Sequence, residues 1–364
     1  MTTPLTVAVI GLRSVGMAHV RAWAARQRSH QDVCLTALSD LDLDLCRRAQ
    51  TEHGAERVFG DYRDLLARDP SEASLVTVCL PTALHERVVV ECLRQGRHVL
   101  CEKPPALDAA AAQRMADAAR EANRVLAYGF QRRFHPQVRA ALEVVQSGRT
   151  GPLYYGRCGW VRSEPAVAAT TPWKLSRASA GGGLFNIGIH LLDVAWYLMG
   201  RPRPVSVCAY GSTHGTRLVA EAAGLPLPPD PAYDTTAALV RFEHADGAPA
   251  ALLVESSLAL HRLPSATPGG STASTPQSIY CDLSGTDGGL SVYPPVFVAG
   301  RHTETLTAED DSRELTTRQL LIEDFLTAVR TNTAPVCPPE DGVTIQRIVD
   351  AIETSATLSR EVTI

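Results

Sequence analysis

Two short stretches of the sequence place acid–base side chains where a fold would hold them rigidly. The first is Glu102-Lys103-Pro104-Pro105, which follows the strand-like run Arg97-His98-Val99-Leu100-Cys101. The two prolines keep the backbone extended or in a turn, and open α/β sheets bind ligands at the carboxyl ends of their strands. A lysine fixed at that edge can donate or accept a proton, or polarise a substrate oxygen. The alternative for this segment alone is a solvated loop lysine.

The second stretch begins with Gly181-Gly182-Gly183 and continues as an apolar, helix-like segment to about Met199. Its polar exceptions are Asn186, His190 and Asp193, spaced i, i+4 and i+7 and therefore on one helix face. Buried polar groups are costly unless they are paired or used. Three interpretations stay open: a core histidine bonded to Asp193, a metal site that lacks a clear third ligand, and an acid/base histidine in a hydride-transfer site.

A glycine-rich turn follows the first apolar run of the chain. The segment Leu5–Ile10 is typical of a buried parallel strand and runs into Gly11-Leu12-Arg13-Ser14-Val15-Gly16 and a helix. Strand, glycine turn and helix in this order form the phosphate-binding unit of dinucleotide folds. Arg13 stands where the fingerprint usually has its middle glycine, so its side chain must swing out or contact the cofactor.

The second expected strand, Val33–Ser39, ends at Asp40, where an acidic side chain accepts hydrogen bonds from the adenosine ribose and repels a 2′-phosphate. NAD is therefore expected rather than NADP. The alternative is that Asp40 only caps the next helix. The strand at residues 74–80 ends at Pro81, so the segment after it should also face the cofactor. The cofactor candidates are Gly11, Leu12, Arg13, Ser14, Val15, Gly16, Asp40, Leu80, Pro81, Thr82, His85, Glu102 and Lys103.

Composition limits the classes of protein that fit. With 364 residues and a net charge of −4, the chain is expected to form two domains and to bind neither nucleic acid nor a membrane. No apolar run has membrane-spanning length, and the start lacks a leader pattern. Nine cysteines without a C-x-x-C pair indicate reduced thiols rather than disulfides or a zinc site. We expect a soluble cytoplasmic protein without a bound metal.

The alternation of elements changes near residue 130. Before it, strands alternate with helices, which predicts a doubly wound parallel sheet of α/β type over residues 1–130. After it, successive strands predict an α+β domain with a large, open, mainly antiparallel sheet over residues 131–364. We expect loops at residues 211–232 and 261–276. The expected strands of this domain are residues 153–161, 205–210, 235–242, 250–257 and 278–284, and its helices residues 138–147, 181–199, 319–331 and 341–359.

The order of these motifs resembles the glucose–fructose oxidoreductase/inositol dehydrogenase/rhizopine-catabolism (Gfo/Idh/MocA) family over nearly the whole chain. The motifs are G-x-x-x-x-G-x-x-H, Glu-Lys-Pro and G-G-G-x-L-x-x-x-G-x-H-x-x-D, followed by a strand at residues 234–242 and a closing helix around residues 351–356. The resemblance implies a Rossmann-type domain that binds NAD(P), and a second domain that binds substrate. It also implies a homodimer or homotetramer that packs its open sheets together.

The resemblance also assigns roles to the two stretches. The family's Glu-Lys-Pro lysine lies beside the nicotinamide and the substrate hydroxyl, which carries over to Lys103. The family's histidine, often the general acid/base, carries over to His190. The position four residues before it is commonly aspartate, and here it is Asn186, which can bind a hydroxyl group but cannot take a proton. Asp193 is then expected to orient the His190 ring.

The expected function is reversible hydride transfer between NAD and a secondary hydroxyl or ketone of a sugar, sugar derivative or cyclitol, with His190 as base and Lys103 polarising the oxygen. Arg162, Lys174 and Arg177 instead favour an acidic or phosphorylated sugar. Two alternatives are an NAD-dependent glycoside hydrolase that oxidises its sugar transiently, and a non-catalytic cofactor-binding protein. The catalytic candidates are Lys103, His190 and Asn186, and the substrate candidates are Lys103, Arg133, Trp160, Trp173, Lys174, Asn186, His190 and Asp193.

Overall fold

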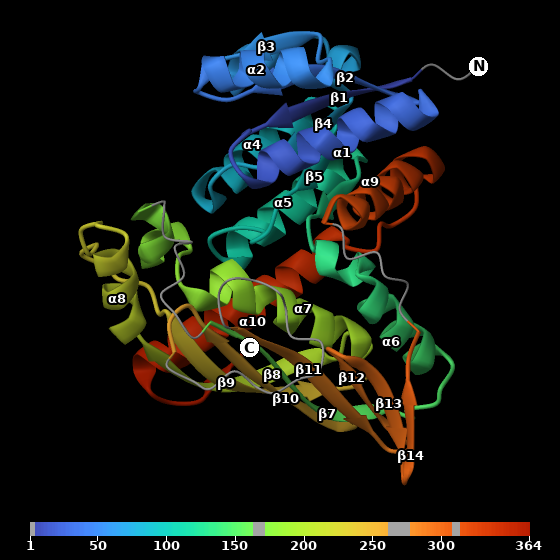
Figure 1. The fold of residues 1–364 in the computed structure, drawn as a ribbon, viewed down its shortest axis with the longest axis vertical. Coiled ribbons are helices and arrows are strands. Elements are labelled where there is room, and N and C mark those ends of the chain that lie inside the picture. Colours follow the sequence, from blue (N-terminus) through green and yellow to red (C-terminus); the bar gives the residue numbers. More distant parts are fainter. Residues whose placement is uncertain (1–3, 163–171, 261–276, 308–313) are drawn as a thin grey trace. The chain divides into compact units, whose positions relative to one another are not determined.

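The computed structural model describes residues 4–162, 172–260, 277–307 and 314–364. The chain forms two compact units (Figure 1). The first unit is Met1–Phe134 together with Asp311–Val343, and the second is His135–Asp310 together with Thr344–Ile364. The expected division at residue 130 places Asp311–Val343 in the second domain, whereas the contacts of that segment assign it to the first unit.

The first unit is built on a six-stranded parallel sheet in the order β3-β2-β1-β4-β5-β6. This is the strand order of the Rossmann fold, with β1 and β4 at the point where the order reverses. The doubly wound parallel sheet is thus confirmed. Its strands are β1 (Leu5–Ile10), β2 (Val33–Ser39), β3 (Arg57–Phe59), β4 (Leu75–Val78), β5 (His98–Cys101) and β6 (Leu126–Tyr128).

Helices connect these strands, and aspartates begin three of them. The side chains of Asp42, Asp61 and Asp108 each accept a hydrogen bond from a first-turn backbone N–H of α2, α3 and α5. Such N-caps replace partners that the first turn of a helix otherwise lacks. The helices of this unit are α1 (Val15–His30), α2 (Leu43–His53), α3 (Tyr62–Leu66), α4 (His85–Arg94), α5 (Ala109–Ala122) and α9 (Glu314–Thr331).

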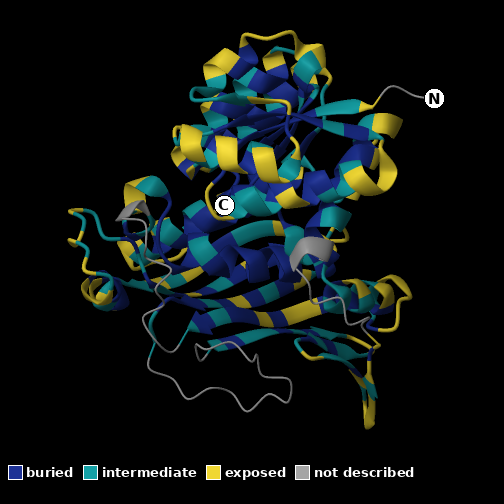
Figure 2. Ribbon diagram, turned by 45° about the horizontal axis from the view of Figure 1, so that its top comes forward, coloured by how far each residue is buried: buried dark blue, intermediate teal, exposed yellow. Residues whose placement is uncertain are grey.

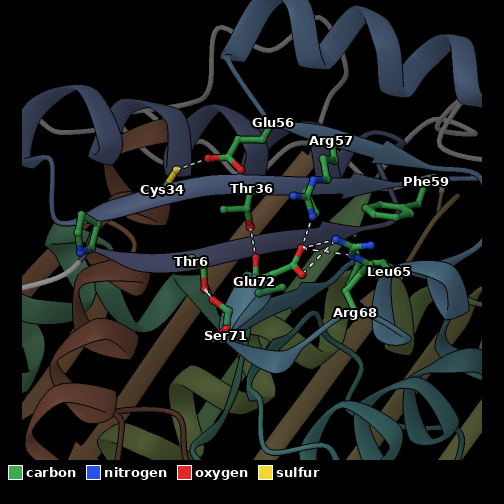
Figure 3. A pocket seen from close by; sticks show the side chains of 13 residues that line it. Thr6, Cys34, Thr36, Glu56, Arg57, Phe59, Leu65, Arg68, Ser71 and Glu72 are labelled. Atoms are coloured by element: carbon green, nitrogen blue, oxygen red, sulfur yellow. Dashed lines mark hydrogen bonds and ion pairs between the residues drawn. The ribbon is translucent and has the colours of Figure 1, made fainter.

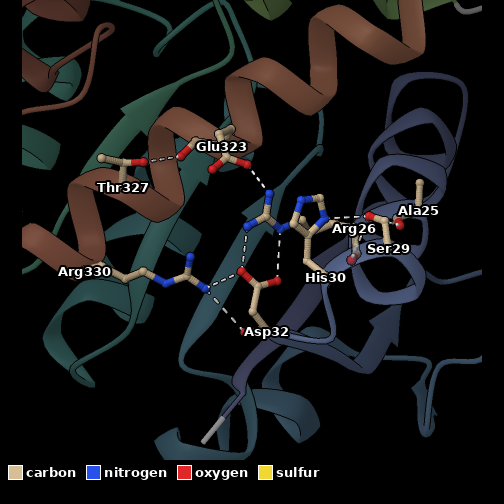
Figure 4. A network of polar contacts seen from close by, with 8 residues as sticks. All are labelled: Ala25, Arg26, Ser29, His30, Asp32, Glu323, Thr327 and Arg330. Carbon is tan, nitrogen blue, oxygen red and sulfur yellow. Dashed lines mark hydrogen bonds and ion pairs between the residues drawn. The ribbon is translucent and has the colours of Figure 1, made fainter. Parts of the chain in front are cut away.

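An ion-pair network joins α9 to the first unit (Figure 4). It explains why the segment Asp311–Val343 belongs to that unit. Asp32, which follows α1, accepts hydrogen bonds from Arg26 Nε at 2.9 Å and from Arg330 Nη2 of α9 at 2.7 Å. Arg26 also pairs with Glu323 of α9. The hydrogen bonds from Arg26, with the charges of both arginines, hold the pKa of the Asp32 carboxyl well below its usual range. These contacts join segments almost 300 residues apart, and no local sequence pattern announces them.

The second unit is built on a nine-stranded sheet in the order β14-β13-β12-β11-β7-β10-β9-β8-β15. Strands β7 and β10 run parallel, and the other pairs among the described strands are antiparallel, which confirms the mainly antiparallel sheet. The edge strands β12 to β15 were not predicted. The strands are β7 (Leu153–Arg162), β8 (Arg203–Ser212), β9 (Thr235–Glu243), β10 (Pro249–Ser257), β11 (Gln277–Gly285), β12 (Gly289–Val292), β13 (Pro295–Ala299), β14 (His302–Thr305) and β15 (Val362–Thr363).

Buried and more exposed residues alternate along the central strands of this sheet (Figure 2). On one face Leu252 and Val254 are buried, and on the other face Leu253 is 41% exposed. Alternation with a period of two is what a sheet with one covered face requires. The helices of this unit are α6 (Pro136–Gln146), α7 (Ile189–Leu198), α8 (His214–Ala222) and most of α10 (Pro339–Leu358).

Residues 211–232 were predicted to be a loop, but they contain helix α8. The expected helix from Gly181 to Met199 begins with a π-helical turn, Leu184–Gly188, before α7. The expected loop at residues 261–276 lies outside the described residues. None of the helices in the described part of the chain combines the length and the apolar composition that crossing a bilayer would need.

Candidate functional site

The glycine turn after β1 leaves the start of α1 open. Gly11 has a φ of 87°, and a Cβ there would lie 2.6 Å from the Cys79 carbonyl oxygen. A Cβ on Gly16 would lie 1.8 Å from the Gly11 carbonyl oxygen, so neither position accepts a side chain. The first turn of α1 has no capping side chain and no acidic residue, and Arg13 is exposed. Backbone N–H groups at such a helix start fit a pyrophosphate.

Asp40 lies where the sequence predicts it, just beyond β2. Its Oδ2 accepts a hydrogen bond from the Leu12 backbone N–H at 2.8 Å, and its Oδ1 accepts one from the Asp42 N–H at 3.0 Å. Asp42 is the residue that caps α2, so the helix-capping interpretation does not account for Asp40. The Asp40 carboxylate therefore holds the glycine turn and the end of β2 together, at the edge that a ribose would occupy.

Lys103 follows β5 and therefore lies at the same edge of the sheet. The Cys79 N–H bonds to Ile10 O at 2.8 Å, and the Glu102 N–H bonds to Val78 O at 2.9 Å. The ends of β1, β4 and β5 are thus in register, and Gly11, Leu80 and Lys103 each follow one of them. Within the first unit, the structure thus brings the glycine turn, Asp40 and the predicted catalytic lysine to one edge of the sheet.

His85 was predicted to contact the cofactor, and the structure gives it an internal position. The residue is 1% exposed. Its Nδ1 lies 2.9 Å from Pro104 O and its Nε2 lies 2.8 Å from Leu80 O. Burial lowers the pKa of the imidazole, while these carbonyl groups oppose the shift. His85 thus links the segment after β4 to the turn that carries Lys103, and it acts by positioning that turn.

Glu102 is buried in a charged cluster behind Lys103, with two partners that sequence reasoning did not connect to it. Its Oε1 lies 2.9 Å from His19 Nε2 of α1 and 3.9 Å from Arg318 Nη2 of α9, and its Oε2 accepts the Lys103 backbone N–H at 3.1 Å. Burial alone would raise the pKa of this carboxyl. The hydrogen bond from His19 and the charges of His19, Arg318 and Lys103 instead hold the pKa below its usual range.

The cluster gives Glu102 a supporting role. A carboxylate that accepts the Lys103 N–H fixes the backbone that carries the lysine side chain. The motif G-x-x-x-x-G-x-x-H contained the signal for His19, because the histidine lies one turn into the helix that starts at the glycine loop. No sequence signal pointed to Arg318, which is 216 positions from Glu102.

In the second unit, His190 lies on the buried helix α7, and its residue is 6% exposed. The ring of Trp160 on β7 lies 6.2 Å from the imidazole, centroid to centroid, at an interplanar angle of 41°. Asp193, one turn further along α7, is fully buried. This burial suits the orienting role expected for Asp193 and does not favour contact with a substrate.

The glycine stretch before α7 packs tightly against the backbone of a neighbouring segment. Gly182 has a φ of 93°, and a Cβ there would lie 2.3 Å from the Tyr233 carbonyl oxygen. Asn186 lies in the π-helical turn, and its Nδ2 donates to Gly182 O at 2.6 Å. π-Helical turns within α-helices often occur at functional sites. The Asn186 amide thus holds the glycine stretch in place.

Other predicted substrate residues have different surroundings. Lys174 lies in the short 3₁₀ helix Pro172–Leu175 and is half-buried. Trp173 is in the same helix, but its side chain lies outside the described part of the structure. Arg133 belongs to the first unit, where its buried guanidinium bonds to Val336 O at 2.7 Å and to Asp341 Oδ2 at 2.5 Å. This inward position does not favour substrate contact, and we leave Arg133 out of the proposed site.

A pocket of about 360 Å³ lies elsewhere on the first unit (Figure 3). Its walls include Thr6 and Cys34, near the starts of β1 and β2, away from the strand ends that carry Gly11 and Asp40. Its charged side chains pair internally: Glu72 bonds to Arg57 and to Arg68, and Cys34 Sγ donates to Glu56 at 3.3 Å. We assign it no part in the site. The described residues also contain no group of three side chains suited to a metal ion.

Both units match domains of known proteins. Residues 5–130 match the family model for the oxidoreductase family with an NAD-binding Rossmann fold, and residues 138–291 match the GFO/IDH/MocA C-terminal domain. D-glucoside 3-dehydrogenase of Escherichia coli (strain K12) is 30% identical, over 98% of this chain and 96% of that protein. D-xylose 1-dehydrogenase (NADP(+)) 2 of Haloferax volcanii is 28% identical, with 96% of each chain covered.

A solved structure and a further sequence relative agree with this assignment. The crystal structure of an oxidoreductase domain protein from Kribbella flavida superposes with a TM-score of 0.82 at 25% identity and covers all of both chains. Myo-inositol 2-dehydrogenase of Thermotoga maritima is 32% identical, over 54% of this chain and 55% of that protein.

Replacing Glu102 tests whether the buried cluster supports this edge. Glu102→Gln leaves His19 and Arg318 without their carboxylate, and we expect it to lower the free energy of unfolding at pH 7 by about 3 kcal/mol. Because the folded pKa of Glu102 is lowered, its stabilisation is present above the unfolded pKa near 4.3 and is lost as pH falls through the folded pKa. Wild type and variant should therefore converge in acid. Urea unfolding at several pH values measures both effects.

Glu86→Gln is the matched control for Glu102→Gln. Glu86 also pairs with an arginine, Arg114, but the pair lies at the surface of the same unit. Surface ion pairs contribute about 0–1 kcal/mol. A loss for Glu102→Gln no larger than that for Glu86→Gln would contradict the supporting role of the cluster.

Proposed function

Because the chain belongs to the Gfo/Idh/MocA family of oxidoreductases, we propose that it transfers a hydride between NAD and a secondary hydroxyl or ketone of a sugar, sugar derivative or cyclitol. The first unit is the family's NAD-binding Rossmann domain, and the relatives named above act on a glucoside, inositol and xylose. The observation that carries the proposal is the position of Lys103 at the strand edge that also carries Gly11 and Asp40.

The proposed chemistry divides the work between two side chains. Bound NAD supplies the hydride acceptor. His190 takes the hydroxyl proton as the carbinol is oxidised and returns it in the reducing direction. Lys103 binds and polarises the same oxygen, and its positive charge stabilises the developing alkoxide. Asn186 and Trp160 contact the remaining hydroxyl groups and ring carbons of the sugar, and Asp193 orients His190.

NAD is proposed over NADP on the contacts of Asp40. Its carboxylate is held at the ribose edge by the Leu12 N–H, where it accepts ribose hydroxyl groups and repels a 2′-phosphate. One relative is named as an NADP(+) enzyme, so the preference for NAD rests on Asp40 of this chain and not on that relative. We also propose that the protein works in the cytoplasm, because all nine of its cysteines are free thiols.

Turnover of a substrate panel tests this function. Aldoses, alkyl glucosides and inositols are supplied with NAD or NADP, and reduced nicotinamide is followed by absorbance. We expect turnover with NAD, and Lys103→Met and His190→Asn should each slow it by about two orders of magnitude or more, since positioned acid–base groups contribute about 10²–10⁴-fold. Undiminished turnover in both variants, or no turnover although NAD binds, would contradict the proposal.

We further propose that the open sheet packs against a second copy of this chain in a homodimer or homotetramer. Register places Tyr155, Leu253 and Tyr210 on the outer face, where they are 39%, 41% and 64% exposed. The same face carries two ion pairs, Arg157–Asp282 and Arg241–Glu361. In a two-fold interface the same patch of both copies meets, so the arginines of one copy can face the carboxylates of the other. Apolar groups gathered on one exposed face of a sheet favour burial.

Light scattering after gel filtration tests the assembly. We expect the mass of a dimer or tetramer for the wild type, and a monomer for Leu253→Asp combined with Tyr155→Asp, because two carboxylates would be buried in the interface. A monomeric wild type would rule out this packing.

A further inference from the structure

The indole ring of Trp160 lies beside the proposed base in the second unit. Trp160 is on β7, on the face of the strand that also carries the buried Cys158. The centre of its ring lies 6.2 Å from the centre of the His190 imidazole, and the two ring planes meet at 41°. Ring pairs at this separation interact, and their energy depends on how the rings are oriented. The orientation of the indole therefore influences the orientation of the imidazole.

A glutamine on the neighbouring strand β11 binds the edge of the indole. Trp160 Nε1 donates a hydrogen bond to Gln277 Oε1 at 3.0 Å. Because an indole N–H can only donate, the amide oxygen of Gln277, and not its nitrogen, must face it. An indole N–H that is shielded from water usually has a partner, since leaving it without one is costly. Turning the indole about its side-chain bonds would break this hydrogen bond.

Strand pairing places Gln277 within reach of Trp160. On β11, Ile279 is opposite Trp160 and Gln277 is opposite Arg162, so Gln277 is the diagonal neighbour of Trp160 on the same face. Diagonal neighbours in an antiparallel pair are within reach of long side chains. Gln277 and Trp160 are 117 positions apart in the sequence, so no local pattern predicts their contact.

The other contacts of the ring are less directional. Trp160 packs against an apolar cluster that includes Leu175 and Ile187. The guanidinium carbon of Arg162 lies 5.7 Å from the centre of the indole ring. Apolar packing has no preferred direction, whereas a hydrogen bond weakens steeply when donor and acceptor are misaligned. Gln277 is therefore the contact that selects one orientation of the indole.

We propose that Gln277 is a positioning residue for His190: it fixes the indole of Trp160, and the indole holds the imidazole in the orientation that accepts the proton of the substrate hydroxyl. This inference rests on the proposed oxidoreductase function. Gln277 acts through Trp160 and needs no contact with the substrate. Because its N–H is bound to Gln277, Trp160 presents ring carbons, and not a donor, to a sugar.

NMR of the full-length protein with isotope-labelled tryptophan and histidine tests both contacts without turnover. The indole N–H signal of Trp160 is assigned by its loss in Trp160→Phe, and the imidazole C–H signals of His190 by their loss in His190→Asn. Gln277→Met keeps the side-chain length and removes the acceptor. We expect it to move the indole N–H signal upfield, and to move the His190 signals because the ring current of the indole acts on them. Gln277→Glu keeps an acceptor at the same reach and should hold both close to their wild-type positions.

Single-turnover oxidation of a sugar by the NAD-bound protein measures the effect on the chemical step. We expect Gln277→Met to lower the maximal rate about 5–10-fold and to change the half-saturating sugar concentration by less than about twofold, since a neutral hydrogen bond contributes about that factor. A loss of rate without a loss of binding is what a misplaced base predicts. Gln277→Glu should recover most of the rate.

Gln27→Met is the matched control. Gln27 Oε1 also accepts a hydrogen bond, from the Leu35 backbone N–H at 2.6 Å, but it lies in the first unit. The same substitution there should leave the signals of Trp160 and His190 unchanged.

Unchanged indole or imidazole signals in Gln277→Met would overturn the proposal, and so would a Gln277→Glu variant that behaves like Gln277→Met. Gln277→Asn, whose amide is one methylene group shorter, gives the same test if Gln277→Met does not fold. If the wild type turns over no sugar although NAD binds, the proposed function fails, and the NMR signals alone decide whether Gln277 orients the His190 ring.

Discussion

The buried carboxylate of Glu102 holds together the part of the molecule on which its chemistry depends. It joins α1 through His19, α9 through Arg318, and the turn after β5 through the Lys103 N–H. These three elements come from the beginning, the end and the middle of the first unit. A charge buried in this way is tolerated only with such partners, and removing one of them leaves the others unsatisfied. The position of Lys103 is therefore coupled to the start of α1, and through α9 to the ion-pair network around Asp32.

The second unit uses packing where the first uses charge. Tight contact of the glycine stretch with the Tyr233 backbone sets the start of α7, and the π-helical turn places Asn186 four residues before His190. Trp160 then contacts the imidazole from β7 and carries Arg162 beside it. In the proposed mechanism, the asparagine at this position leaves proton transfer to His190, whose ring Asp193 orients.

Sequence reasoning found the elements whose patterns are local. Continuous apolar runs predicted the parallel strands. The glycine turn, Asp40 and the Glu-Lys-Pro segment could be placed at one edge of the sheet because each follows the end of a strand. Helix α8 was missed because its stabilising contacts are tertiary: Thr216 bonds to Asp234 Oδ1 at 3.1 Å and to Ala232 O at 2.7 Å. The inward position of Arg133 and the pairing of Glu102 with Arg318 likewise depend on residues about 200 positions away. The roles of the catalytic residues remain predictions.

The most direct test of hydride transfer follows the hydrogen itself. A sugar carrying deuterium on the carbon that is oxidised is incubated with NAD, and both products are examined by mass spectrometry and NMR. Direct oxidation predicts one deuterium at C4 of the reduced nicotinamide and a primary isotope effect on single-turnover oxidation. Deuterium that returns to the sugar after cleavage of a glycosidic bond would instead indicate transient oxidation by a hydrolase. Deuterium that stays on the unreacted sugar would contradict the account altogether.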